Sequence, residues 1–152
     1  MDDWPVGRWS AEISSGSPRL HCMSALPITI PPTDAQLRTL PNGLEIIVKD
    51  DHGAPVVSVQ AWVRTGSCLE HEFLGAGISH LVEHMVFKGT ASRGPAEQAR
   101  QVQAIGGYLN AYTSFDRTVY YIDAPLEGLD TVLEVLTDLV VNAAFPEGEF
   151  EK

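Results

Sequence analysis

The stretch LDTVLEVLTDLVVNA, residues 129–143, carries the strongest amphipathic pattern in the chain and decides the fold class. Its apolar residues recur at helical spacing, and they are Leu129, Val132, Leu133, Leu136, Leu139, Val140 and Ala143. A helix with one apolar stripe has to bury that stripe against another element. The pattern therefore predicts a helix that packs on a sheet, and it implies no cofactor.

Strand-like segments before this stretch would supply the sheet. Residues 56–63 alternate apolar and polar side chains, which is the period of a strand with one better-buried face. Residues 108–113 and 117–122 are aromatic and β-branched, and they predict a hairpin. A shorter hairpin is predicted for 37–40 and 44–49, because the Asn-Gly pair between them favours the positive φ angles of a tight turn.

Two helices are predicted between the strands, over residues 78–87 and from Pro95 to the Gly106-Gly107 pair. In the second helix we expect four side chains to face inward, namely Ala96, Ala99, Val102 and Ile105. The element order is then β-β-β-α-α-β-β-α. Strands in groups with helices between them predict an α+β fold, with a mixed or antiparallel sheet and helices packed on one face.

The two ends of the chain differ from the middle. Residues 1–35 hold five of the ten prolines and many serines, so we expect a flexible extension there and an ordered domain over 36–152. The last residues, 145–152, have the acidic character of a first helical turn, so we expect the chain to stop inside an element.

The charge balance excludes some partners. Ten Lys and Arg against twenty Asp and Glu give a net charge of -10, whereas nucleic acids and anionic membrane surfaces attract basic patches. No run approaches the ~18 apolar residues of a membrane-spanning helix, and the acidic start lacks a secretory leader. We therefore expect no nucleic-acid or membrane partner. The compartment is unknown from the sequence, and we expect the cytoplasm because no signal peptide or membrane-spanning segment is predicted. Cys22 and Cys68 are expected to be free thiols.

One motif predicts chemistry, and it is His80-Leu81-Val82-Glu83-His84. Histidines four residues apart lie on one helix face, so two imidazole nitrogens can reach one ion at the ~2.0–2.1 Å that zinc prefers. Glu83 lies on the flank of that face, where its carboxylate can take a proton from an activated water. Two ligands and an adjacent base predict peptide hydrolysis. The motif itself supplies no third protein ligand for the metal. The plainer alternative is a solvated polar helix face.

A longer string, GAGISHLVEHMVFKGT over residues 75–90, closely resembles the active-site helix of the pitrilysin and mitochondrial processing peptidase family, whose inverted zinc motif is H-x-x-E-H. The resemblance continues through further segments, which are residues 40–44, 106–113, 116–121 and 145–146. It spans roughly residues 36–152 and leaves residues 1–35 outside.

The resemblance implies a zinc-dependent metalloendopeptidase that cleaves peptides or extended protein segments and uses one Zn²⁺. His80 and His84 match the family's two histidine ligands, and Glu83 matches its catalytic base. The third family ligand is a glutamate on a later helix, which we expect beyond Lys152. The chain is thus expected to be the incomplete N-terminal part of a peptidase domain, weakly active or inactive alone.

The resemblance also implies partners. Asn110-Ala111-Tyr112-Thr113 resembles the family's edge strand, to which an extended peptide adds through backbone hydrogen bonds. A missing C-terminal half or a partner subunit would close a chamber over the peptide substrate. Two alternatives stay open. The chain is a non-catalytic peptide-binding or partner subunit of a processing-peptidase-like complex, or it is a truncated product without stable function.

Overall fold

The computed structural model describes residues 33–150. The chain divides into two units, one up to Lys49 and one from Asp50 onward, and each is described by itself. The expected extension over residues 1–35 lies almost entirely outside the described residues. No helix within the described range is both long and apolar enough to cross a membrane.

The first unit contains a small antiparallel hairpin of β1 (Gln36–Thr39) and β2 (Glu45–Val48). Gly43 in its turn has a φ of 85°, and the Asn42 side chain accepts a hydrogen bond from the Leu44 N–H at 3.1 Å. The hairpin predicted from the Asn-Gly pair is confirmed.

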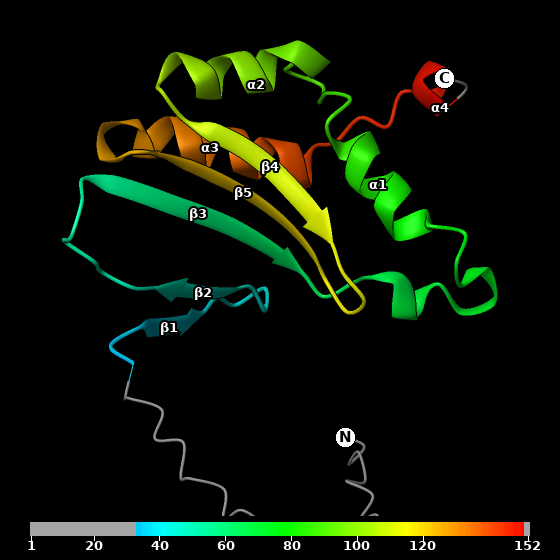
Figure 1. Ribbon diagram of the computed structural model, residues 1–152, viewed down its shortest axis with the longest axis horizontal. Coiled ribbons are helices and arrows are strands. Elements are labelled where there is room, and N and C mark those ends of the chain that lie inside the picture. Colours follow the sequence, from blue (N-terminus) through cyan, green and yellow to red (C-terminus); the bar gives the residue numbers. More distant parts are fainter. Residues whose placement is uncertain (1–32, 151–152) are drawn as a thin grey trace, which may run out of the picture. The chain divides into compact units, whose positions relative to one another are not determined.

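The second unit is built on a three-stranded antiparallel sheet in the order β3-β5-β4 (Figure 1). Its strands are β3 (Val56–Val63), β4 (Tyr108–Thr113) and β5 (Thr118–Pro125). β5 is central and pairs with both neighbours. Among the described residues, β4 is therefore an edge strand of this sheet.

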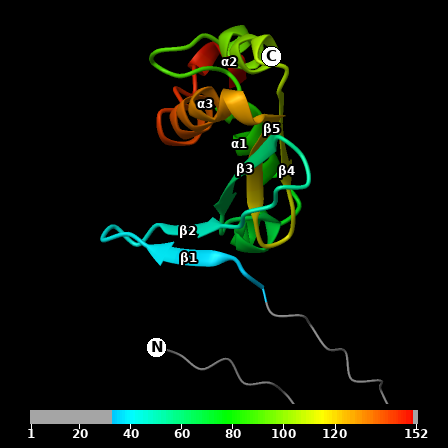
Figure 2. The same ribbon diagram turned by 90° about the vertical axis from the view of Figure 1, so that its left-hand side faces the viewer.

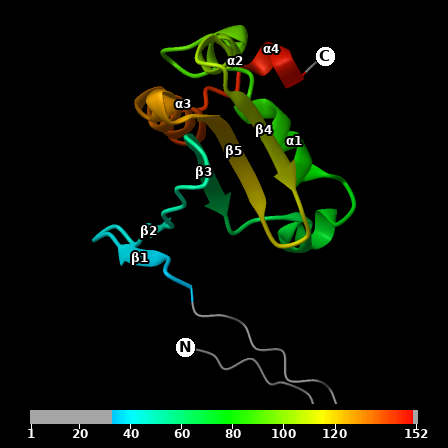
Figure 3. The ribbon, with the colours of Figure 1, turned by 60° about the vertical axis from the view of Figure 1, so that its left-hand side comes forward.

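Helices cover one face of the sheet, as predicted (Figures 1 and 3). The long helix α3 (Leu129–Val141) lies on β5 and β3, and α2 (Pro95–Ala104) contacts α3 and β4. The helix α1 (Ile78–Val86) lies against β4. A single turn, α4 (Glu147–Phe150), follows α3. The view in Figure 2 shows α2 and α3 together on the same side of the sheet.

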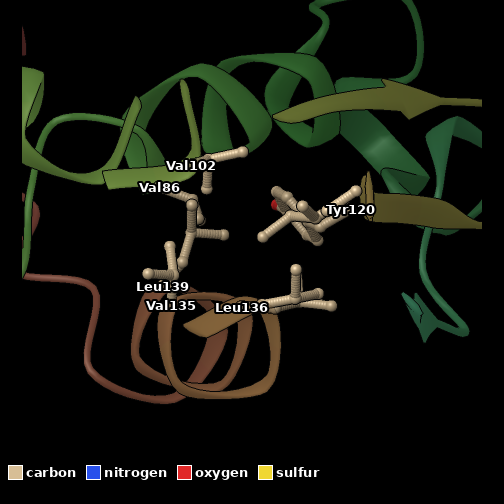
Figure 4. Packing of buried hydrophobic residues seen from close by; sticks show 9 residues of the cluster. Val86, Val102, Tyr120, Val135, Leu136 and Leu139 are labelled. Atoms are coloured by element: carbon tan, nitrogen blue, oxygen red, sulfur yellow. The ribbon is translucent and has the colours of Figure 1, made fainter. Parts of the chain in front are cut away.

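The hydrophobic core lies between the sheet and the helices. Alternate residues of β5 contribute to it, and helical side chains meet them. Figure 4 shows Tyr120 of β5 facing side chains of the helices. The cluster comprises Val86, Val102, Tyr120, Ile122, Ala124, Val132, Val135, Leu136 and Leu139. Burying an aliphatic side chain of this size contributes roughly 1.5–3 kcal/mol relative to leaving it exposed, so this cluster is the main source of stability.

Two expectations about helix faces were wrong in part. Leu133 is 46% exposed, whereas Val135, which was not among the residues expected to face inward, is buried. In α2 the alanines at 96 and 99 are exposed, whereas Gln98 and Val102 are buried. Burial of an alanine contributes little free energy, so the alanines do not determine which face of α2 turns inward.

The loop after α1 is fastened to α3 by Asp138. Its carboxylate accepts hydrogen bonds from Thr90 Oγ1 at 2.7 Å, Ser92 Oγ at 3.0 Å and Arg93 Nη1 at 2.8 Å. The side chains of Arg93 and Asp138 are only 12% and 11% exposed. Asn142, Thr90 and the other donors hold the pKa of Asp138 well below its usual range, against the opposing effect of burial.

We predict that Asp138 makes the fold acid-sensitive. A carboxyl whose folded-state pKa is lowered stabilises the protein above its unfolded pKa of about 4, and this contribution is lost as the pH falls toward the lower folded value. Asp138→Asn is expected to cost about 2–4 kcal/mol at pH 7 and to flatten the pH dependence of stability below pH 4, measured by urea unfolding. The exposed Asp130→Asn is the control, and an equal loss there would contradict the prediction.

Gly66 lies where the loop after β3 meets the turn between β4 and β5. A Cβ at this position would lie 2.4 Å from the Ser114 carbonyl oxygen and 2.7 Å from the Arg117 nitrogen. Gly66→Ala is therefore expected to cost about 1–3 kcal/mol in unfolding free energy. The matched control is Gly94→Ala, because a Cβ there meets no atom within 4 Å. Equal stability of the two variants would show that the loop does not depend on this close approach.

Candidate metal centre

Helix α1 presents two different sides. Glu83, Met85 and Val86 are buried, whereas His80 and His84 are exposed. The helix places the histidines one turn apart, as the spacing predicted.

The two imidazoles converge. The Nε2 atoms of His80 and His84 are 3.1 Å apart, and the ring centroids are 4.5 Å apart with the planes at 65°. Two nitrogens that share a tetrahedral zinc ion at ~2.0–2.1 Å are roughly 3.3 Å apart. The observed separation of the two nitrogens is therefore close to the one that a shared zinc ion requires.

Glu83 lies beside this pair but on the buried side of α1, with only 8% exposure. Its Oε2 accepts a short hydrogen bond from the hydroxyl of Thr113 at the end of β4. Within residues 33–150 no ion pair engages its carboxylate. Burial and, to a smaller extent, the Glu83 charge raise the pKa of Tyr120 to about 12, so this neighbour keeps its proton at neutral pH.

Within the described part of the chain the donor set stops at two histidines. No group of three or more His, Cys, Asp or Glu side chains lies close enough to hold a metal ion there. The carboxylate of Glu149 in α4 pairs with Lys88 Nζ at 3.1 Å.

The edge strand brings the predicted peptide-binding residues to α1. Thr113 turns its hydroxyl toward Glu83, so the structure gives it a contact that the sequence did not suggest. Asn110 Oδ1 accepts the backbone N–H of Ala111 at 2.8 Å, and Asn110 Nδ2 donates to Tyr108 Oη at 2.6 Å. An added peptide strand would have to compete with the Asn110 side chain for the Ala111 N–H. Tyr112 is 40% exposed.

Glu70 is a residue for which the sequence gave no role. It is 8% exposed, and its Oε1 accepts the Ser79 N–H at 2.8 Å, at the start of α1. It also borders a cavity of about 360 Å³ with a mainly apolar lining that includes Phe73, Ile78 and Val82. No periodicity identifies such a contact, because it joins a loop to a helix.

Comparison with known proteins places this chain in a family. Residues 45–152 match the model of the insulinase family of peptidases, family M16. The beta subunit of mitochondrial-processing peptidase from Mus musculus is 33% identical over 150 residues, which cover 97% of this chain and 30% of that protein. The uncharacterized zinc protease YmxG of Bacillus subtilis (strain 168) is 37% identical over 114 residues, 75% of this chain and 28% of that protein.

Solved structures give the same result. A protease from Helicobacter pylori superimposes with a TM-score of 0.71 at 32% identity, covering 78% of this chain and 29% of that one. The M16 inactive domain from Pseudomonas fluorescens has a TM-score of 0.68 at 16% identity, which shows the fold alone. The chain spans about 30% of the length of these relatives. The family match, the shared fold and the relatives named as peptidases together establish that this chain belongs to the insulinase family of peptidases, family M16.

Proposed function

We propose that this chain forms the zinc-binding and water-activating part of a metalloendopeptidase. The observation that carries the proposal is the convergence of the His80 and His84 Nε2 atoms, 3.1 Å apart, beside a carboxylate with no competing ion pair in the described range. Relatives named as zinc proteases support the same chemistry. The third protein ligand would come from outside residues 33–150.

Each residue has a distinct role in this proposal. His80 and His84 would hold one Zn²⁺, which supplies Lewis acidity to polarise a peptide carbonyl and to acidify a water. Glu83 accepts the proton of the attacking water and passes it to the leaving amine. Thr113 keeps Glu83 Oε2 engaged through its hydroxyl and so fixes the orientation of the carboxylate.

The proposed substrate is an extended peptide. β4 is an edge strand in the described sheet, and an added strand would gain backbone hydrogen bonds without strict sequence preference. Asn110, Ala111, Tyr112 and Thr113 would lie along it, with Thr113 next to the base. Because one relative is named as a subunit, we also propose that further polypeptide completes the site and encloses the peptide.

Zinc binding tests the ligand assignment directly. We expect the chain to bind Zn²⁺ weakly, because two protein ligands are fewer than the three of a catalytic site. His80→Ala should weaken binding at least about tenfold, measured by competition with a chromophoric chelator. His52→Ala removes an exposed histidine outside α1 and should leave the affinity unchanged. Equal affinity of wild type and His80→Ala would remove the basis for the metal site.

The substitution Glu83→Gln tests peptide hydrolysis separately from zinc binding. It should leave zinc affinity within about twofold and lower peptide hydrolysis by roughly 10²–10⁴, because a general base is lost. The chain alone is expected to hydrolyse peptides slowly, so the assay measures bond cleavage by mass spectrometry over hours, with Glu72→Gln as the control. Zinc-independent peptide binding without Glu83-dependent cleavage would favour the non-catalytic alternative. Robust turnover by the chain alone would contradict the need for further ligands.

A further inference from the structure

Helix α1 starts without a cap of its own. Its N-cap residue, Gly77, has a left-handed conformation with φ 77° and ψ 28°, and no side chain there accepts a helix N–H. The first turn also contains no acidic residue. A helix leaves four N–H groups unpaired at its start, and these need an acceptor. A nine-residue helix such as α1 gains little from its own backbone hydrogen bonds, so this deficiency matters more than in a long helix.

A carboxylate from another segment supplies the acceptor. Glu70 Oε1 lies 2.8 Å from the Ser79 nitrogen, and the side chain is almost fully buried. The Ser79 N–H, with smaller contributions from the Ser79 hydroxyl and the amides of Gly77 and Gly75, lowers the pKa of Glu70, while burial opposes this change. The carboxylate is therefore negative at neutral pH and lies at the positive end of the helix dipole.

Glu70 is itself held in place by the sheet. The short 3₁₀ turn Ser67–Leu69 precedes it, and the Cys68 N–H donates to the Phe115 carbonyl at 2.9 Å in the turn between β4 and β5. The strand β4 that enters this turn also carries Thr113, which binds Glu83. One hairpin thus fixes both the first turn of α1 and its buried carboxylate.

We propose that Glu70 is a positioning residue for the two histidines of α1. Its carboxylate caps α1 and holds the first turn, in which His80 lies. The inference rests on the proposed zinc site. Ser79 immediately precedes His80, so loss of the acceptor loosens the turn that carries this ligand, whereas His84 lies a full turn further on. Fraying of that turn lowers the fraction of molecules in which both imidazoles converge, and the apparent affinity for zinc falls in proportion.

The experiment compares Glu70→Ala, Glu70→Gln and the matched control Glu72→Ala in the full chain. Glu72 is an exposed carboxylate of the same loop. Zinc affinity is measured by chelator competition, and amide hydrogen exchange is followed by NMR at Ser79, at Leu81, whose N–H donates to the Gly77 carbonyl at 2.9 Å, and in the core strand β5. In Glu70→Ala we expect faster exchange at Ser79 and Leu81 and zinc binding weakened by roughly 2–30-fold, the range that loss of a helix cap corresponds to. Protection in β5 should be unchanged.

The other variants decide the interpretation. Glu70→Gln keeps an acceptor for the Ser79 N–H and should recover most of the zinc affinity, while Glu72→Ala should match wild type. Wild-type zinc binding and wild-type Ser79 exchange in Glu70→Ala would overturn the inference, as would an equal loss in Glu72→Ala. If wild type and His80→Ala bind zinc equally, the proposed metal site fails. Exchange at Ser79 and Leu81 then still decides whether Glu70 holds the first turn of α1.

Discussion

A helix of nine residues is barely stable in water, because the cost of forming its first turn is spread over few hydrogen bonds. The arrangement of the site therefore depends on how α1 is held against β4. Met85 and Val86 are buried on one side of the helix, and Thr113 contacts Glu83 on the same side. His80 and His84 remain exposed on the other side. The hairpin of β4 and β5 thus holds α1 in place and thereby determines where the two imidazoles lie.

The buried carboxylate of Glu83 differs from that of Asp138 in the number of its hydrogen-bond donors. Burying an ionisable group is costly unless it is hydrogen-bonded, and this carboxylate has only the Thr113 hydroxyl as a partner in the described part of the chain. Asp138 is different, because its donors include Thr90 and Arg93, and it fastens the loop after α1 to α3. The carboxylate with many donors stabilises the fold, whereas the one with a single donor is the residue that we propose as the base.

Membership in the insulinase family agrees with the fold, and the geometry is the reason why we propose α1 as the element that carries the catalytic residues. The two nitrogens already lie near the separation that one tetrahedral ion requires. The edge position of β4 adds a surface to which an extended chain can pair, next to the carboxylate. In the proposed peptidase site, the two histidine ligands, the base Glu83 and the edge strand β4 therefore lie together at one corner of the sheet.

The sequence by itself determined the element order, the Asn-Gly hairpin and the pairing of His80 with His84, because these features depend on local dihedral preferences and on the period of a helix. Only the tertiary structure decided which face of α2 is buried and which partners reach α1. Glu70 meets Ser79 across a loop, and Thr113 meets Glu83 across 30 residues of chain. Such contacts follow from the path of the backbone around the core, and no local pattern of residues encodes that path.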